Sequence, residues 1–184
     1  MTTANKLTIM RIALIPVFLV VLYLDFAGAR WWALGIFIVA CLTDFADGYI
    51  ARHYNQITNF GKFMDPLADK CLTTAAIIYM VVDGVCSPIV LAIIMFREFA
   101  VAGVRMIAAE SGTVIAANMW GKVKTVLQMV TVLFYYFATA LAPADGIGLV
   151  SGITQVLCWA VAAVTLLSGG IYLWQNRQCF MQAK

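Results

Sequence analysis

Long apolar stretches alternate with short polar segments along the whole chain. A helix needs roughly 20 apolar residues to cross a bilayer, and six stretches approach that length. Gly, Pro, Asp and Ser residues stand between the stretches, as is typical of turns. The pattern therefore predicts six membrane-spanning helices, at about residues 7–24, 31–51, 61–82, 87–109, 119–142 and 149–174.

The first stretch begins with a more polar segment. Asn5, Lys6, Thr8 and Arg11 all precede its fully apolar part. A helix with one polar and one apolar side lies favourably in the membrane interface, and proline tends to kink or end a helix. We expect residues 2–13 to form an amphipathic juxtamembrane segment before Pro16 turns the chain inward. Asn5 is equally well explained as the N-cap of that helix.

The composition agrees with this pattern. Hydrophobic residues make up 64% of the 184 residues and charged residues 11%, whereas soluble domains are about half apolar and about a quarter charged. We expect an all-α polytopic membrane protein. No polar or Pro-rich linker interrupts residues 1–184, which favours a single domain. Lysines and arginines are spread along the chain, so no nucleic-acid partner is expected.

The positive charges predict an orientation. Cytoplasmic loops carry an excess of Lys and Arg, and an even number of crossings places both termini on one side. The opposite loops carry Arg30 together with Asp25, Asp83 and Asp145. Both termini are therefore predicted to be cytoplasmic. The basic residues on that side are Lys6, Arg11, Arg52, Lys62, Lys122, Lys124, Arg177 and Lys184.

Four aspartates stand near the cytoplasmic ends of the second and third predicted helices. Asp44 and Asp47 are i,i+3 neighbours, and Asp65 and Asp69 are i,i+4 neighbours, so each pair lies on one face of its helix. The loop between the helices is short, which makes them antiparallel neighbours. At 1.5 Å per residue, Asp44 and Asp69 each lie about 12 Å from the helix end, so the two pairs can meet at one level.

Such a cluster is costly without cations. One ionised aspartate at mid-membrane is unfavourable by roughly 2.5–3.5 kcal/mol, and close carboxylates repel each other further. Protonation or hard divalent cations with oxygen ligands relieve this cost. Four carboxylates that converge on a water-accessible cavity suit a two-metal site holding Mg²⁺, Mn²⁺ or Ca²⁺, and suit Zn²⁺ less well.

The pattern D-x2-D-G-x2-A-R-x8-G-x3-D-x3-D over residues 44–69 resembles the signature of the CDP-alcohol phosphatidyltransferase family without departure. The resemblance implies six transmembrane helices, a homodimer, and displacement of CMP from a CDP-linked lipid or alcohol. It also implies a bacterial cell membrane, with the active site on the cytoplasmic side. Asp44, Asp47, Asp65 and Asp69 would bind two metals, Mg²⁺ or Mn²⁺, and Asp69 would also be the general base.

The same resemblance implies residues near the CDP-diacylglycerol. Gly48, Arg52 and Thr58 would contact the CDP moiety, with Gly61 beside them. Tight helix packing explains each glycine equally well when it is taken alone, and Arg52 and Thr58 are also typical of solvated loops. Asn5 and Thr8, with Arg11, resemble the family's N-terminal element near the nucleotide.

Intramembrane cations bear on the acceptor alcohol. Arg97, Arg105, Lys122 and Lys124 fall in the cytoplasmic halves of the fourth and fifth predicted helices. A neutral acceptor needs no such cations, whereas an acceptor that carries its own phosphate does. Alternatively, Glu98 pairs with Arg97 or Arg105 and the lysines contact lipid headgroups.

The stretch Arg97-Glu-Phe-Ala-Val-x-Gly-x-Arg105, followed by Gly-Lys-x-Lys-Thr, closely resembles bacterial family members that use glycerol 3-phosphate. Transfer of a phosphatidyl group from CDP-diacylglycerol to glycerol 3-phosphate is the implied reaction. Phosphatidylglycerol and inositol phosphate are the alternative acceptors. An ion-coupled transporter would also explain intramembrane charges, but it predicts an internal repeat, and the acidic motif occurs once.

Overall fold

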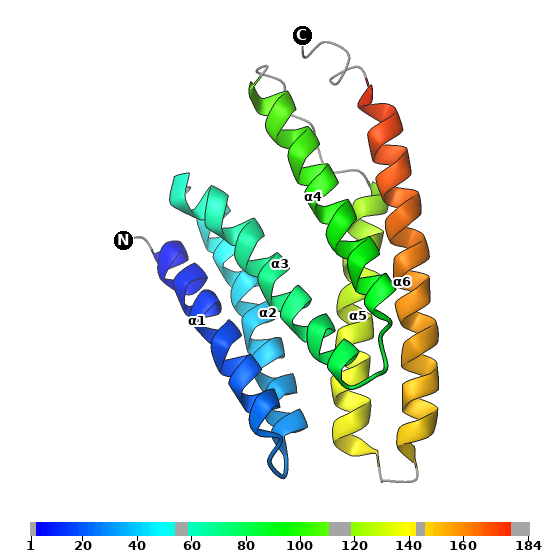
Figure 1. The fold of residues 1–184 in the computed structure, drawn as a ribbon. Helices are drawn as coiled ribbons and strands as arrows, with labels where there is room; N and C mark the ends of the chain where they lie inside the picture. The colour runs from blue at the N-terminus through cyan, green and yellow to red at the C-terminus, as the bar shows by residue number, and fades with distance from the viewer. Residues whose placement is uncertain (1–2, 54–58, 111–118, 143–145, 178–184) are drawn as a thin grey trace. The chain divides into compact units, whose positions relative to one another are not determined.

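The computed structural model describes residues 3–53, 59–110, 119–142 and 146–177, and its long elements there are all α-helices. Each helix begins and ends within a few residues of a predicted span, except that α1 also includes the polar N-terminal segment. Figure 1 shows them in chain order: α1 (Thr3–Leu24), α2 (Ala29–His53), α3 (Asn59–Val82), α4 (Pro88–Glu110), α5 (Met119–Leu141) and α6 (Ile147–Gln175).

The predicted turn at Asp83 and Gly84 is confirmed, and its geometry explains why glycine stands there. Gly84 has φ +76°, in the left-handed region that favours glycine. The N–H of Gly84 donates to the carbonyl of Val81, and the N–H of Val85 donates to Met80, both at 3.0 Å. These two bonds form a Schellman motif that satisfies the last carbonyls of α3.

The prediction that Pro16 turns the chain is wrong. Helix α1 continues through Pro16 to Leu24, and Thr8 and Arg11 are both buried. Proline removes one backbone hydrogen bond, but neighbouring helices allow it inside apolar helices. The polar residues near the start of α1 thus include two that pack inside the protein. The juxtamembrane position of the segment stays a prediction.

The chain divides into two compact units, and helices α3, α5 and α6 contribute to both. The first unit comprises Met1–Tyr79 and Val132–Val150, and the second comprises Met80–Thr131 and Ser151–Lys184. The single-domain organisation stays a prediction.

Helices α1 and α2 pack side by side in the first unit (Figure 1). Phe18 of α1 lies between two aromatic rings of other helices, 6.3 Å from Phe37 and 5.6 Å from Tyr136 between centroids. The Tyr136 hydroxyl donates to the carbonyl of Ala76 at 3.1 Å. The Tyr79 hydroxyl donates to Leu19 at 3.2 Å. The buried Tyr136 and the partly buried Tyr79 thus both bond to helix carbonyls, which avoids unsatisfied hydroxyls in this core.

The second unit contains α4 with parts of α5 and α6. Val101 and Val104 of α4 form a buried cluster with Tyr172 of α6. Arg105 lies over the Tyr172 ring, 5.8 Å from its centroid, and its Nε donates to the Tyr172 hydroxyl at 3.3 Å. This packing fixes one face of α4 against α6.

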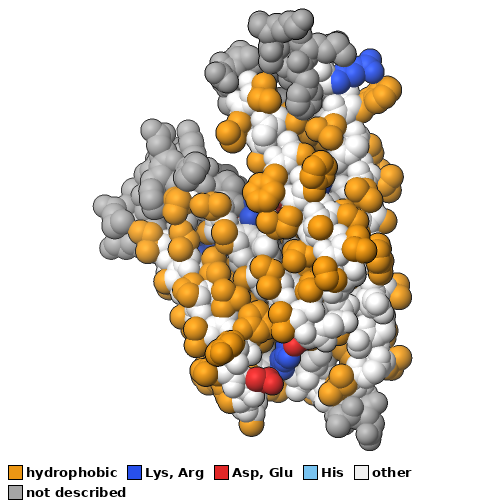
Figure 2. Space-filling view, viewed as in Figure 1, with side chains coloured by type: hydrophobic (Ala, Val, Ile, Leu, Met, Phe, Trp, Pro, Cys, Tyr) orange, Lys and Arg blue, Asp and Glu red, His pale blue; other side chains and the backbone are white. Residues whose placement is uncertain are grey.

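Hydrophobic side chains cover much of the outer surface of the described helices, as Figure 2 shows for one face. Among the described residues, α1 from Leu7, α5 and α6 are long and apolar enough to cross a membrane. Helices α2, α3 and α4 have similar lengths but contain the charged clusters of the sequence. Exposed apolar surface of this extent is characteristic of a membrane protein.

Candidate active site

An ion pair joins α1 to the helix that carries the first two aspartates. Nη1 of Arg11 lies 2.6 Å from Oδ1 of Asp44, and the Arg11 side chain is 1% exposed. The Asp44 side chain remains 41% exposed, so part of its carboxylate is still accessible. A buried arginine needs such a partner because an unpaired charge inside a protein is strongly unfavourable.

The structure brings the carboxylates of Asp44 and Asp69 into one region of the first unit. Both interact electrostatically with the thiol of Cys41, which stands on α2 one turn before Asp44. Asp69 is half-buried on α3. The Thr73 hydroxyl donates to the Asp69 carbonyl at 3.0 Å, so that hydroxyl bonds to the α3 backbone. Figure 1 shows α2 and α3 running in opposite directions, as predicted for the two acidic helices.

The remaining two aspartates lie on the same helices, but their side chains are outside the described residues. The same holds for the side chains of Asn5 and Arg52 and for the surroundings of Gly48 and Gly61, although the backbones of these four residues are helical, and for Thr58 as a whole. Among the described side chains, no group of three or more His, Cys, Asp or Glu residues converges. The site of four carboxylates and the CDP-diacylglycerol contacts therefore stay predictions.

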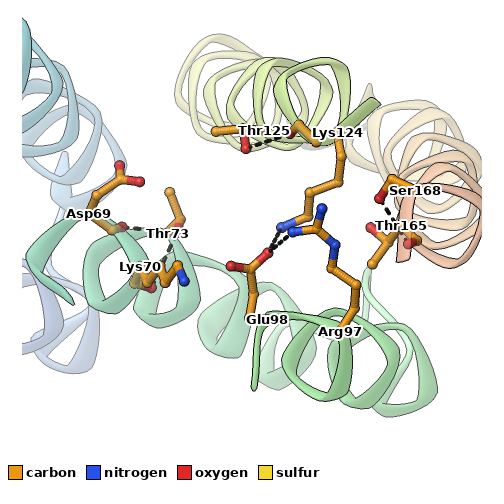
Figure 3. A network of polar contacts seen from close by, with 10 residues as sticks. Asp69, Lys70, Thr73, Arg97, Glu98, Lys124, Thr125, Thr165 and Ser168 are labelled. Carbon is orange, nitrogen blue, oxygen red and sulfur yellow. Dashed lines mark hydrogen bonds and ion pairs between the residues drawn. The ribbon is translucent and has the colours of Figure 1, made fainter. Parts of the chain in front are cut away.

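A second polar cluster lies in the second unit and centres on Glu98. Its Oε1 accepts a hydrogen bond from Nη1 of Arg97 at 3.0 Å and from Nζ of Lys124 at 2.8 Å. Figure 3 shows Arg97 of α4 and Lys124 of α5 reaching the same carboxylate. The Lys124 side chain is 4% exposed. The alternative that Glu98 pairs with Arg97 is confirmed, and Lys124 is a further partner that the sequence did not indicate.

The other two predicted acceptor-binding cations differ from this pair. Arg105 contacts Tyr172, as described above, whereas the ion pairs described for Glu98 are those with Arg97 and Lys124. Lys122 is exposed on α5. The structure thus groups Arg97 with Lys124 around one carboxylate, while Arg105 is held by an aromatic residue of α6.

Two residues with structural importance were not assigned to the site from sequence. Arg11 was placed only near the nucleotide by resemblance, although its spacing from Thr8 put both on one face of α1. Glu98 was considered only as a neutralising partner. Both residues are charged and stand within apolar stretches. Such charges are usually paired inside the protein, and this was the signal that could have indicated their roles.

Comparisons with known proteins agree with the acidic motif. A model of the CDP-alcohol phosphatidyltransferase family matches residues 1–167. A Bacillus subtilis protein named CDP-diacylglycerol--glycerol-3-phosphate 3-phosphatidyltransferase is 44% identical over 141 residues, covering 70% of this chain and 72% of its own. A Rickettsia felis protein of the same name is 36% identical over 168 residues, covering 91% of each chain.

Proposed function

Because the chain belongs to the CDP-alcohol phosphatidyltransferase family, we propose that it transfers the phosphatidyl group of CDP-diacylglycerol to sn-glycerol 3-phosphate. The products are phosphatidylglycerophosphate and CMP, in phospholipid biosynthesis. The observation that carries this proposal is the identity of 34–44% to relatives named for this reaction. The Rickettsia relatives among them align over nearly the whole chain.

The acidic helices suit a metal-dependent reaction. Asp44, Asp47, Asp65 and Asp69 would hold two divalent cations, Mg²⁺ or Mn²⁺. Asp44 and Asp69 supply the hard carboxylate oxygens that these ions prefer, and the exposed part of Asp44 remains available beside Arg11. When bound, the cations would neutralise the diphosphate and stabilise the leaving CMP.

The chain's own residues supply the base. Asp69 accepts the proton of the acceptor hydroxyl, whose oxygen forms a bond to the phosphorus that carries diacylglycerol. The bond from this phosphorus to the oxygen of CMP breaks, and CMP leaves with the bonding electrons. Asp69 stands on the helical part of α3 and is half-buried, which limits the conformations of its carboxylate. A base held beside the acceptor hydroxyl accelerates transfer by orientation as well as by proton removal.

The cations of the second unit suit an acceptor with its own phosphate. Arg97 and Lys124 share Glu98, and these three side chains together carry a net positive charge. Arg105 and Lys122 add two further cations on α4 and α5. Buried arginine and lysine donors bind phosphate oxygens by charge-assisted hydrogen bonds. A neutral acceptor would leave this charge uncompensated.

The substrates and the membrane complete the proposal. Asn5, Thr8, Gly48, Arg52, Thr58 and Gly61 would contact CDP-diacylglycerol, which enters from the lipid, whereas glycerol 3-phosphate enters from water. We propose six transmembrane helices with both termini in the cytoplasm of a bacterium, which would put the site at the inner face of the cell membrane. The family resemblance supports a homodimer.

Acceptor specificity tests this function. Membranes containing the expressed chain would receive CDP-diacylglycerol and one labelled acceptor: glycerol 3-phosphate, phosphatidylglycerol or inositol phosphate. We expect label to enter lipid from glycerol 3-phosphate, with one CMP released for each lipid formed. Membranes with the Asp69→Asn chain are the control. Label that enters only from another acceptor would reassign the substrate, and transport without CMP release would reject the transferase.

A further inference from the structure

The side chain of Arg97 runs across two glycines of neighbouring helices. A Cβ atom on Gly169 of α6 would lie 2.9 Å from Cγ and 3.9 Å from Cβ of Arg97. A Cβ atom on Gly121 of α5 would lie 3.1 Å from Nη2 of the same side chain. The tight contact at Gly169 is with Cγ of Arg97, which can move away only if χ1 changes, and that change redirects the rest of the side chain. Only a glycine at position 169 therefore permits this path for Arg97.

The adjacent glycine has no such role. A Cβ atom on Gly170 would have no neighbour within 4 Å, and the residue is exposed. Helix propensity favours alanine over glycine at both positions by about 1 kcal/mol. Glycine is therefore needed at position 169 because the Arg97 side chain passes there, and it is not needed at position 170.

The path of Arg97 leads its guanidinium to Glu98, where Lys124 also ends (Figure 3). Nε of Arg97 is buried and has no hydrogen-bond partner within the described residues. A guanidinium has five N–H donors, and such a donor inside an apolar bundle is costly when it is left unbonded. Arg97 therefore keeps donor capacity that an anion can use.

The second unit contains two further buried polar atoms, an amide oxygen and a hydroxyl oxygen. Oε1 of Gln128 and Oγ1 of Thr165 are buried without a hydrogen-bond partner among the described residues. Gln128 stands one turn after Lys124 on the buried side of α5, and Thr165 stands one turn before Gly169 on the buried side of α6. Native proteins leave few such atoms unsatisfied, and a ligand is one explanation where they occur together with cations.

We propose that Gly169 and Glu98 are positioning residues for the acceptor phosphate, a role that rests on the function proposed above. Gly169 gives Arg97 room to lie between α5 and α6. Glu98 holds the Arg97 guanidinium and the Lys124 ammonium at one point, so that both donate to the same phosphate group. Neither Gly169 nor Glu98 contacts the reacting atoms; each acts through Arg97, and Glu98 also acts through Lys124.

Steady-state kinetics of the purified full chain in lipid nanodiscs test the proposal, with Gly169→Ala compared to its neighbour Gly170→Ala. We expect Gly169→Ala to raise the KM for glycerol 3-phosphate about tenfold, the value of one lost charge-assisted contact. The kcat and the KM for CDP-diacylglycerol should change by less than about twofold. Gly170→Ala should leave all three parameters unchanged.

A double-mutant cycle separates positioning from a general packing defect. If Gly169 acts through Arg97, Gly169→Ala should have no further effect on the KM in an Arg97→Ala background, because residues that share one function are not additive. Equal effects of Gly169→Ala in the two backgrounds, or equal effects of Gly169→Ala and Gly170→Ala, would overturn the role of Gly169.

Glu98→Gln keeps the proposal testable if Gly169→Ala does not fold. This variant keeps the side-chain shape and removes the charge that holds two cations, so the KM for glycerol 3-phosphate should again rise about tenfold. An unchanged KM would reject the role of Glu98. A wild-type chain that does not use glycerol 3-phosphate would instead reject the proposed function, so the two failures are distinguishable.

Discussion

Arg11 is bound to Asp44 at 2.6 Å, and this contact joins the N-terminal helix to the acidic motif. The arginine is almost fully buried, while the aspartate keeps an exposed part. A positive charge at this place reduces the repulsion between Asp44 and Asp69, which both act electrostatically on the Cys41 thiol. It also limits the rotamers of Asp44. The N-terminal helix therefore contributes directly to the geometry of the candidate active site.

Replacing Arg11 by methionine should lower both stability and activity. The methionine fills similar apolar volume but loses the ion pair with Asp44, and a contact to a charged group is worth about 1.5–3 kcal/mol. We expect a lower thermal unfolding midpoint and a CMP release rate reduced at least about tenfold, because Asp44 is no longer oriented.

Arg30→Met is the matched control, since Arg30 lies over the Tyr135 ring and is distant in sequence from the four aspartates of the acidic motif. Equal losses in both variants would argue against a specific role for Arg11.

Asp69→Asn should abolish turnover while the protein still folds. An amide cannot accept the acceptor's proton, although its oxygen can still bind a cation weakly. CMP release measured with saturating substrates should fall by about 10²-fold or more, as for loss of a general base. Asp83→Asn, at the turn after α3, should keep wild-type turnover. Substantial activity in Asp69→Asn would assign the base to another group.

The helices were predictable because their apolar stretches match the length that a bilayer requires. The fourth helix was expected at residues 87–109 and lies at Pro88–Glu110, and the sixth was expected at 149–174 and lies at Ile147–Gln175. Turn residues such as Gly84 limited the ends of these stretches. The course of α1 was not predictable, because a proline near polar residues is compatible with either a turn or a continuous helix.

The pairing of charges was only partly predictable. The spacing of the aspartates indicated which of them share a face, and Asp44 and Asp69 do lie in one region of the first unit. The partners of Glu98 depend on which helices are adjacent, which the sequence does not state. The sequence could not show that the group packed against Gly169 is Arg97.

Removal of divalent metal should stop the reaction reversibly. A chelator should abolish CMP release, and Mg²⁺ or Mn²⁺ should restore it, whereas Zn²⁺ should restore it poorly. Metal that binds only the folded chain also stabilises it, by about 2.7 kcal/mol at a metal concentration of 100 times the Kd. The thermal unfolding midpoint should therefore rise when metal is added. This stabilisation should be lost in Asp44→Asn. Full activity in excess chelator would contradict a metal-dependent mechanism.

The proposed topology predicts the location of two fusion points. A reporter enzyme that is active only after export should be inactive when fused to the C-terminus at Lys184. It should be active when fused after Gly84, in the turn between α3 and α4. Even numbers of crossings place both termini together, and the Lys and Arg excess assigns that side to the cytoplasm. Activity at both points, or at Lys184 alone, would require a different number of spans or the opposite orientation.

Lys124→Ala should weaken the acceptor more than the lipid donor. The change removes one of two cations at Glu98, and Arg97 then remains as a partner of this partly buried carboxylate. The two charges cancel, so the attraction for a phosphate falls. We expect the KM for glycerol 3-phosphate to rise about tenfold or more, with the KM for CDP-diacylglycerol within about twofold. Lys70→Ala, on α3 next to Asp69 in the sequence, is the control for loss of one lysine charge and should change neither value. An equal rise in both KM values for Lys124→Ala would place this lysine outside the acceptor site and favour a structural role beside Glu98.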